Sequence, residues 1–137
     1  EHGRLLIGAD LLKPRDILEA AYDDASGVTA AFNLNILNVV NRELDADFQP
    51  ELFRHHVRFD EAHRRIEMQL VARERHSVRL ARHTRRYFGA GEHIVTEYSH
   101  KYSVDEFRAL LAASGMRCSH YWTDPQNWFG VFLAEPA

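Results

Sequence analysis

The sequence of 137 residues has a single cysteine, Cys118, so no intrachain disulfide can form. This scarcity is typical of a reducing compartment and predicts a cytoplasmic location. No apolar run approaches the roughly 20 residues that a membrane-spanning helix needs. The N-terminus also lacks the basic segment and apolar stretch of a secretory signal peptide. These absences predict a protein with no membrane partner.

Glycine-rich loops are missing as well. No Gly-x-Gly-x-x-Gly turn or Walker loop follows an apolar run, so this chain by itself offers no recognisable cradle for a nucleotide-like cofactor. The net charge of −3 gives no case for nucleic-acid binding. The nine histidines show no compact ligand spacing, so we expect no metal site and expect the histidines to be solvated strand residues.

The hydrophobic fraction of 45% is enough for a compact domain with a core. The chain opens with a nearly continuous apolar run from Arg4 to Asp10, which is typical of a parallel strand buried on both faces. Such a strand needs neighbours, yet the chain begins almost at it and has no initiator methionine. We therefore expect the sequence to be part of a longer protein.

Two helices are predicted next. Pro14 can open the first, with Ile17 and Leu18 on its apolar face, and residues 23–27 form a break. The second runs from Val28 to about Asp45. It has apolar residues on more than one side, which predicts a helix packed between two layers. The apolar stripe of this second helix consists of Val28, Phe32, Ile36, Val39 and Val40, widened by Leu34, Leu37 and Leu44.

The middle of the chain changes to a period of two, which predicts antiparallel strands with one covered and one wet face. The alternating segments are residues 55–59, 66–70, 77–80 and 94–101, with turns at 60–63 and 89–91. The arginines between residues 64 and 86 are interspersed with acidic residues. This mixture favours a solvated sheet face over a phosphate-binding surface.

The last third predicts a helix and a strand hairpin. Ser103 and Glu106 form a capping box, and Gly115 is a C-terminal stop signal. Strands are expected at 116–122 and 128–134, joined by a turn at 123–127. We expect Trp122, Trp128 and Phe129 to be packing residues and Cys118 to be a small core residue. The two ends of the chain thus suggest one α/β sheet, the middle suggests a second lobe, and a ligand site at the lobe junction would be unsurprising.

The segment Ile94–Lys101 has the most unusual pattern, because neither of its faces is cleanly apolar or polar. Glu97 and Ser99 have apolar or aromatic neighbours. A partly buried carboxylate at Glu97 would need a cation or hydrogen-bond donors, which a ligand imidazole or ammonium could supply. The pattern alone favours the other interpretation, an exposed acid on an amphipathic edge strand.

Several blocks of sequence resemble the histidine-specific, S-adenosylmethionine-dependent methyltransferases, and together they cover essentially the whole chain. The resemblance implies an α+β fragment of an α/β class I, Rossmann-like methyltransferase. Within it, an antiparallel-sheet-plus-helices substrate lobe is inserted between C-terminal core strands. The blocks are residues 5–11, 18–33, 41–48, 65–68, 96–99 and 122–124.

The resemblance also implies a division of the chain and a set of site residues. Residues 1–12 would be a core strand, residues 13–101 the substrate-recognition lobe, and residues 102–137 the C-terminal helix and strand hairpin of the core. The implied substrate-binding residues are Tyr22 for the substrate carboxylate, Glu97 and Ser99 for the imidazole, and Met68 as a pocket wall. No catalytic residue is assigned.

The implied activity transfers methyl groups from S-adenosylmethionine to the α-amine of L-histidine. The product would be hercynine, the precursor of ergothioneine. The donor would bind sequence that precedes this chain, so we expect the chain alone to be inactive. Three alternatives stay open: a non-catalytic amino-acid-binding module, an interaction module, and a related methyltransferase with a different amine substrate. A truncated sheet would also expose strand edges, through which copies of the chain could associate.

Overall fold

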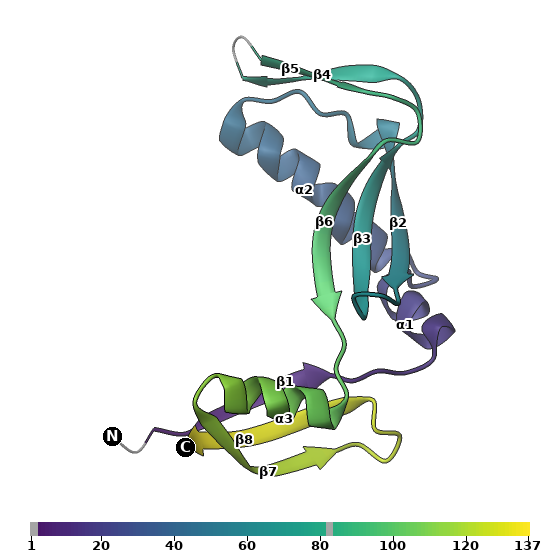
Figure 1. Ribbon diagram of the computed structural model, residues 1–137. Coiled ribbons are helices and arrows are strands. Elements are labelled where there is room, and N and C mark those ends of the chain that lie inside the picture. The colour runs from purple at the N-terminus through teal and green to yellow at the C-terminus, as the bar shows by residue number, and fades with distance from the viewer. Residues whose placement is uncertain (1–2, 82–83) are drawn as a thin grey trace. The chain divides into compact units, whose positions relative to one another are not determined.

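The computed structural model describes residues 3–81 and 84–137 and divides them into two compact units. Unit 1 contains the described residues up to Pro14, residues 61–65 and residues from His100 onward. Unit 2 contains the other described residues. Unit 1 holds β1 (Leu5–Asp10), α3 (Val104–Ala113), β7 (Met116–Thr123) and β8 (Phe129–Pro136) (Figure 1). Unit 2 holds α1 (Arg15–Tyr22), α2 (Val28–Leu44), the short 3-10 helix η1 (Pro50–Leu52), β2 (Phe53–Asp60), β3 (Arg65–Ala72), β4 (His76–Ala81), β5 (Thr84–Phe88) and β6 (His93–His100).

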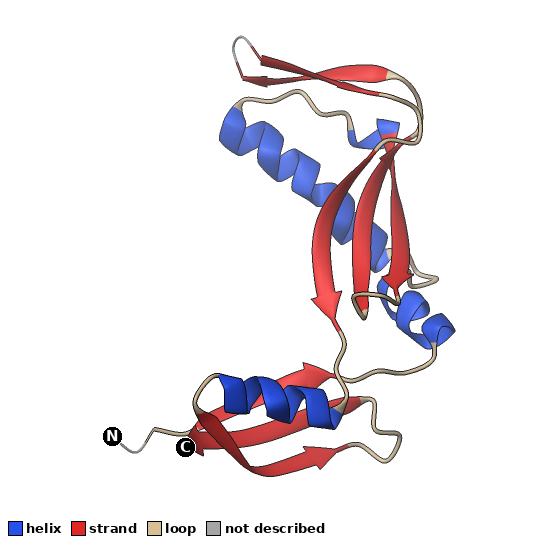
Figure 2. Cartoon of the chain, in the orientation of Figure 1, coloured by secondary structure: helices blue, strands red, loops and turns tan. Residues whose placement is uncertain are grey.

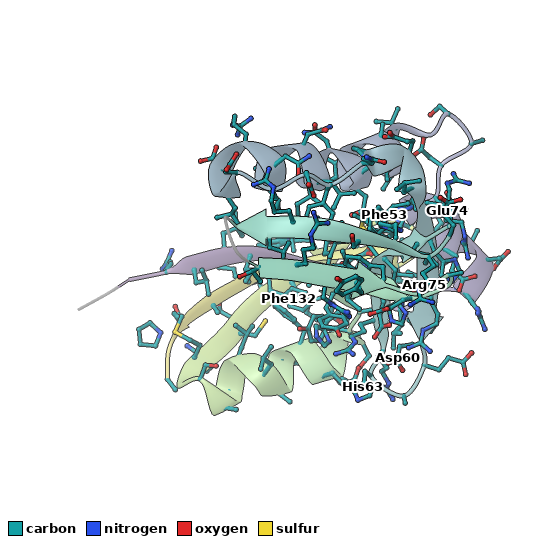
Figure 3. The ribbon with its side chains drawn as sticks, turned by 90° about the horizontal axis from the view of Figure 1, so that it is seen from above. Phe53, Asp60, His63, Glu74, Arg75 and Phe132 are labelled. Atoms are coloured by element: carbon teal, nitrogen blue, oxygen red, sulfur yellow. The ribbon has the colours of Figure 1, made fainter. Side chains whose placement is uncertain are left out.

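Unit 1 is a three-stranded sheet in the order β1-β8-β7, with α3 on one face (Figure 2). Since β8 is antiparallel to both neighbours, the first and last strands of the chain share one sheet. Phe132 lies at the centre of the core, is fully buried, and is labelled in Figure 3. Its ring centroid is 4.6 Å from that of Phe107 on α3. The other buried residues of this core are Ala9, Leu11, Leu111 and Ala134.

The expectation that the opening strand is parallel and buried on both faces is wrong. β1 pairs antiparallel with β8, and Leu6 at its start is 65% exposed. The reason is that α3 covers only one face of the sheet, and within residues 3–81 and 84–137 no second strand pairs with β1. On the open face, the half-exposed ring of Phe129 lies against Gly8. A Cβ atom at Gly8 would lie 2.6 Å from this ring, so a larger residue would require the ring to move.

The aromatic residues near the β7–β8 turn are also not core residues. Trp122, Trp128 and Phe129 are 53%, 41% and 48% exposed. Trp122 and Phe129 alternate with residues that pack beneath α3, so they belong to the sheet face that α3 leaves open. Cys118 does pack against the core, but it is only half-buried.

An ion pair ties the end of β1 to the segment between β6 and α3. The Lys101 side chain is fully buried, and its Nζ lies 2.7 Å from an Asp10 carboxylate oxygen. Lys13 contacts the other carboxylate oxygen at 2.5 Å. Burial works to raise the pKa of Asp10, but the hydrogen bonds and attraction from Lys101 and Lys13 outweigh it and lower the pKa below its ordinary value. Asp10 therefore stays ionised and anchors two separate parts of unit 1.

Unit 2 has a three-stranded sheet in the order β2-β3-β6, which α2 crosses on one face, and a separate β4–β5 hairpin (Figures 1 and 2). Phe53, labelled in Figure 3, is 1% exposed and lies at the centre of the larger core. That core also contains Leu37, Phe48, Leu70, Ala72, Val78 and Phe88. The sequence pattern did not predict β5, whose residues are mostly exposed and include adjacent arginines.

Two expectations about unit 2 are wrong. The 66–70 segment was expected to have a wet face, but β3 is the central strand, and even Glu67 is only 5% exposed. The second helix was expected to pack between layers, but Val28 and Phe32 are 67% and 70% exposed. α2 buries a different stripe, with Asn33 and Leu37 at its centre, because only one side of the helix meets the sheet.

The two local predictions at the ends of α3 are confirmed. The Ser103–Glu106 capping box begins α3, and Gly115 has the positive φ of 74° expected just after a helix. Among the described residues, no helix has the length and apolar character needed to cross a membrane. Residues 82–83, which include one of the expected arginines and one of the histidines, lie outside the described part of the chain.

Candidate functional site

Two of the expected site residues are in direct contact in unit 2. The Tyr22 hydroxyl, on the last residue of α1, lies 2.7 Å from the Ser99 hydroxyl on β6. The two residues are 77 positions apart in the sequence. Because either hydroxyl can donate, the pair can rearrange its protons to suit a ligand. This contact fixes the end of α1 against the sheet's edge strand.

The other two expected residues, Met68 and Glu97, line a pocket of about 290 Å³ between α2 and the sheet. Its α2 wall is largely apolar, because the exposed stripe of this helix faces it. The Thr96 hydroxyl donates a 3.0 Å hydrogen bond to the Met68 carbonyl, which ties together the two strands that form the other wall. The lining consists of Phe32, Asn33, Asn35, Ile36, Val39, Met68, Thr96 and Glu97.

Glu97 differs from Glu67, an acidic residue on the central strand of the same sheet. Glu67 is buried and accepts hydrogen bonds from Arg58 at 3.0 Å and from Gln69 at 3.2 Å. Glu97 is exposed, and within residues 3–81 and 84–137 its carboxylate has no hydrogen bond or ion pair. An unpaired carboxylate beside apolar walls is suited to accept hydrogen bonds from a ligand that combines a flat apolar surface with N–H donors.

The two pairs of residues belong to one structural neighbourhood. Met68 is 3% exposed and forms a small core with Leu18, Val57 and Ile66. The half-buried Tyr22 ring packs against this same core. All four expected residues therefore lie on α1, β3 and β6 of unit 2. Tyr22 and Ser99 are in contact, Met68 and Glu97 line the same pocket, and Tyr22 packs against the core that contains Met68.

The sequence pattern did not single out two residues next to this neighbourhood, Asn33 and His55. The Asn33 amide nitrogen lies 2.9 Å from His55 Nδ1 and 3.3 Å from the Gln69 carbonyl oxygen. His55 Nε2 lies 2.9 Å from the carbonyl oxygen of Tyr22. The expectation that strand histidines are solvated is therefore wrong for the half-buried His55. The available signal was a polar residue in the middle of an apolar helix, which must find partners if it is buried.

The turn before α2 is held by Asp24, two residues after Tyr22. Its carboxylate accepts hydrogen bonds from the Ser26 hydroxyl and from the backbone N–H groups of Val28 and Thr29, the last at 2.8 Å. The Ser26 hydroxyl bond, followed by the bonds from Thr29 and Val28, lowers the pKa of Asp24 far below its ordinary value. Asp24 is thus an ionised cap that fixes the start of the pocket-lining helix.

The described residues offer no fitting cradle for a nucleotide-like cofactor. The strand-to-helix connection in unit 1, residues 11–14, contains no glycine and places Pro14 directly before α1. The N-terminus of α3 is occupied by its own capping box. In the part of the chain that the structure describes, no group of three or more His, Cys, Asp or Glu side chains is placed to hold a metal ion.

Comparison with known proteins identifies the class. Residues 1–136 match the family described as histidine-specific methyltransferase, SAM-dependent. The chain belongs to this family. It is 49% identical over 131 residues to a histidine N-alpha-methyltransferase of Mycolicibacterium smegmatis and 47% identical over 131 residues to one of Mycobacterium tuberculosis. Each alignment covers 95% of this chain, and the chain spans 41% of the length of these relatives.

Proposed function

We propose that this chain is the histidine-recognising C-terminal part of an enzyme that transfers methyl groups from S-adenosylmethionine to the α-amine of L-histidine, giving hercynine. The observation that carries the proposal is the unpaired Glu97 carboxylate at an apolar pocket, in a chain of the histidine-specific family. Both curated relatives are named for methylating this amine.

The pocket chemistry supports an imidazole ligand. Imidazole has two apolar faces and two ring nitrogens, of which one carries hydrogen in the neutral form. Met68 and Phe32 supply apolar surface, and Glu97 can accept the N–H. The Ser99 hydroxyl can donate to or accept from the other nitrogen. Tyr22, already hydrogen-bonded to Ser99, would direct its hydroxyl to the substrate carboxylate.

In this proposal the chain's own residues position the substrate. S-adenosylmethionine supplies an activated methyl group when it is bound, and it is assigned to no residue of this chain. The α-amine must be unprotonated and held in line with that methyl group, so orientation is the main contribution of the lobe. We accordingly propose residues 13–101 as the substrate lobe and the isolated 137-residue chain as inactive.

The sheet of unit 1 supports the proposal that this unit is part of a larger α/β core. β1 and β7 run in the same direction on either side of β8, as in mixed sheets that carry an antiparallel strand. Within the described residues of unit 1, α3 covers one face of the sheet, whereas doubly wound sheets carry helices on both faces. We propose that the rest of the parent protein covers the open face at Leu6, Trp122 and Phe129. In the isolated chain this face would favour self-association.

The decisive experiment compares Glu97→Ala with wild type in the full-length parent enzyme. Losing a hydrogen bond to a charged group costs about 1.5–3 kcal/mol, so we expect the KM for histidine to rise roughly 10- to 100-fold. The KM for S-adenosylmethionine should stay within about twofold, because Glu97 contacts only the amino acid in this proposal. Glu51→Ala, at an exposed acid on η1, is the matched control.

Two outcomes would contradict the proposal. Equal losses for histidine and the methyl donor would show that Glu97 is structural. A wild-type parent that methylates another α-amine but not histidine would show a different substrate. Tight histidine binding by the isolated chain, measured by calorimetry, would instead favour a stand-alone binding module.

A further inference from the structure

A chain of hydrogen bonds crosses unit 2 from α2 to the end of α1. It runs from Asn33 through His55 on β2 to the backbone carbonyl of Tyr22, and we call it the Asn33–His55 relay. Asn33 is only 3% exposed, which is unusual for a polar residue in the middle of a helix. Both ends of the relay are backbone carbonyl oxygens, those of Gln69 and Tyr22.

These two carbonyls fix the direction of every bond in the relay. A carbonyl oxygen can only accept, so the Asn33 group 3.3 Å from the Gln69 oxygen must be the NH₂. That NH₂ then donates to His55 Nδ1 as well, at 2.9 Å. With Nδ1 accepting, the ring hydrogen lies on Nε2, where it donates to the Tyr22 carbonyl at 2.9 Å. A single histidine tautomer satisfies all partners.

The relay acts at a helix end that needs support. The last carbonyls of a helix have no partners within the helix, and Tyr22 is the final residue of α1. His55 holds this carbonyl from β2, while the Tyr22 hydroxyl reaches Ser99 on β6 at 2.7 Å. Tyr22 is therefore held at both its backbone and its side-chain end by different strands of one sheet.

We propose that Asn33 and His55 are positioning residues for substrate recognition, which they serve by fixing the Tyr22 backbone so that its hydroxyl stays beside Ser99. The inference rests on the proposed function, because it treats Tyr22 and Ser99 as substrate contacts. Binding groups must be held to within about 0.5 Å for productive geometry. A relay of three directional bonds meets this need without itself contacting the substrate.

The first test uses kinetics of the full-length parent. His55→Leu removes both ring nitrogens, and we expect the KM for histidine to rise about tenfold with kcat and the donor KM within about twofold. His55→Gln keeps one acceptor and one donor on a side chain of similar length and should restore the KM to within about threefold of wild type. His56→Leu, at the exposed neighbouring position, should change nothing.

A double-mutant cycle with Tyr22→Phe tests whether His55 acts through Tyr22. If it does, the double variant should raise the KM for histidine little more than Tyr22→Phe alone. The inference would be overturned if the KM increases of the two single variants multiplied in the double variant. It would also be overturned if His55→Gln raised the KM as much as His55→Leu.

A further measurement covers the case in which His55→Leu does not fold. Nitrogen-15 NMR of the wild-type parent reports directly which ring nitrogen carries hydrogen. The relay requires the Nε2–H tautomer of His55 at neutral pH, and an Nδ1–H tautomer or a doubly protonated ring would overturn it. Should the parent prefer an amine other than histidine, the proposed substrate fails. The same KM ratios, taken with that amine, still decide the relay.

Discussion

Lys101 and Glu97 lie four residues apart near the end of β6, yet their surroundings are opposite. The Lys101 side chain is fully buried, and its ammonium group lies 2.7 Å from Asp10. Glu97 is exposed, and no described residue within 3–81 or 84–137 pairs with its carboxylate. The first charge is paired inside unit 1, and the second lies at the pocket of unit 2, where we propose that the substrate pairs with it.

If the proposed function holds, this difference separates a structural charge from a ligand-binding charge. A buried ion must have its partners within the protein, because the desolvation penalty is otherwise uncompensated. An exposed acid at an apolar pocket carries no such cost and can exchange water for a ligand. Partial exposure alone does not make an acid available to a ligand, since the half-buried Asp24 already accepts hydrogen bonds from the backbone N–H groups of Val28 and Thr29.

The largest expected effect follows from breaking the buried ion pair. Asp10→Asn removes the negative charge that faces the buried Lys101 ammonium group, and we expect a loss of about 2–3 kcal/mol in the free energy of unfolding. The value is below the usual range for buried pairs because the Asp10 side chain is 29% exposed. Chemical unfolding of the parent protein measures it, with the exposed Asp23→Asn as control. Equal stabilities of the Asp10→Asn and Asp23→Asn variants would show that the Asp10–Lys101 ion pair does not stabilise the fold.

Phe32→Ala tests the apolar side of the pocket. Phe32 is 70% exposed and lines the pocket, so its truncation should cost little stability. It removes ligand contact surface, and at about 25 cal/mol per Å² of apolar area we expect a roughly fivefold rise in the KM for histidine. Leu44→Ala is the control, because Leu44 is 58% exposed on the same helix but does not line the pocket. Equal effects of the two changes would argue against the pocket.

Asp24→Ala should give a smaller effect that depends on pH. Because the folded-state pKa of Asp24 lies below its ordinary value of 3.8, the carboxylate stabilises the fold at all pH values above 3.8. That stabilisation is lost as the pH falls from there through the lower folded pKa. We expect Asp24→Ala to lower the Tm by a few degrees at neutral pH, and the difference to shrink below about pH 4. A difference independent of pH would show that ionisation of Asp24 is not involved.

Patterns contained within a few residues were predictable from the sequence. Ser103 and Glu106 satisfy the first N–H groups of α3 using only local geometry, so spacing alone identifies them. The side-by-side placement of Tyr22 and Ser99 is different, since 77 residues separate them and no periodicity connects them. Only the family resemblance grouped them, and their roles in binding remain a prediction.

Features that depend on neighbours in space could not be predicted. The period of two in β3 indicated a wet face, but Glu67 is only 5% exposed and is hydrogen-bonded to Arg58 of the neighbouring strand and to Gln69. The same limit applies to Trp122, whose burial depends on which sheet face a helix covers. His55 looked like a solvated histidine because its partners, Asn33 and Tyr22, come from two other elements.

The smallest expected effect on stability is that of Glu97→Gln. The fold makes no ion pair with this carboxylate within the described residues, so the unfolding free energy of the ligand-free parent should change by less than about 0.5 kcal/mol. In contrast, we expect Glu97→Gln to have a large effect on the stabilisation that histidine binding provides. Added histidine should raise the Tm of the wild-type parent, because ligand binds only the folded state, and Glu97→Gln should lose most of this rise. If Glu97→Gln lowered the unfolding free energy of the ligand-free parent as much as Asp10→Asn does, Glu97 would have a structural role like that of Lys101.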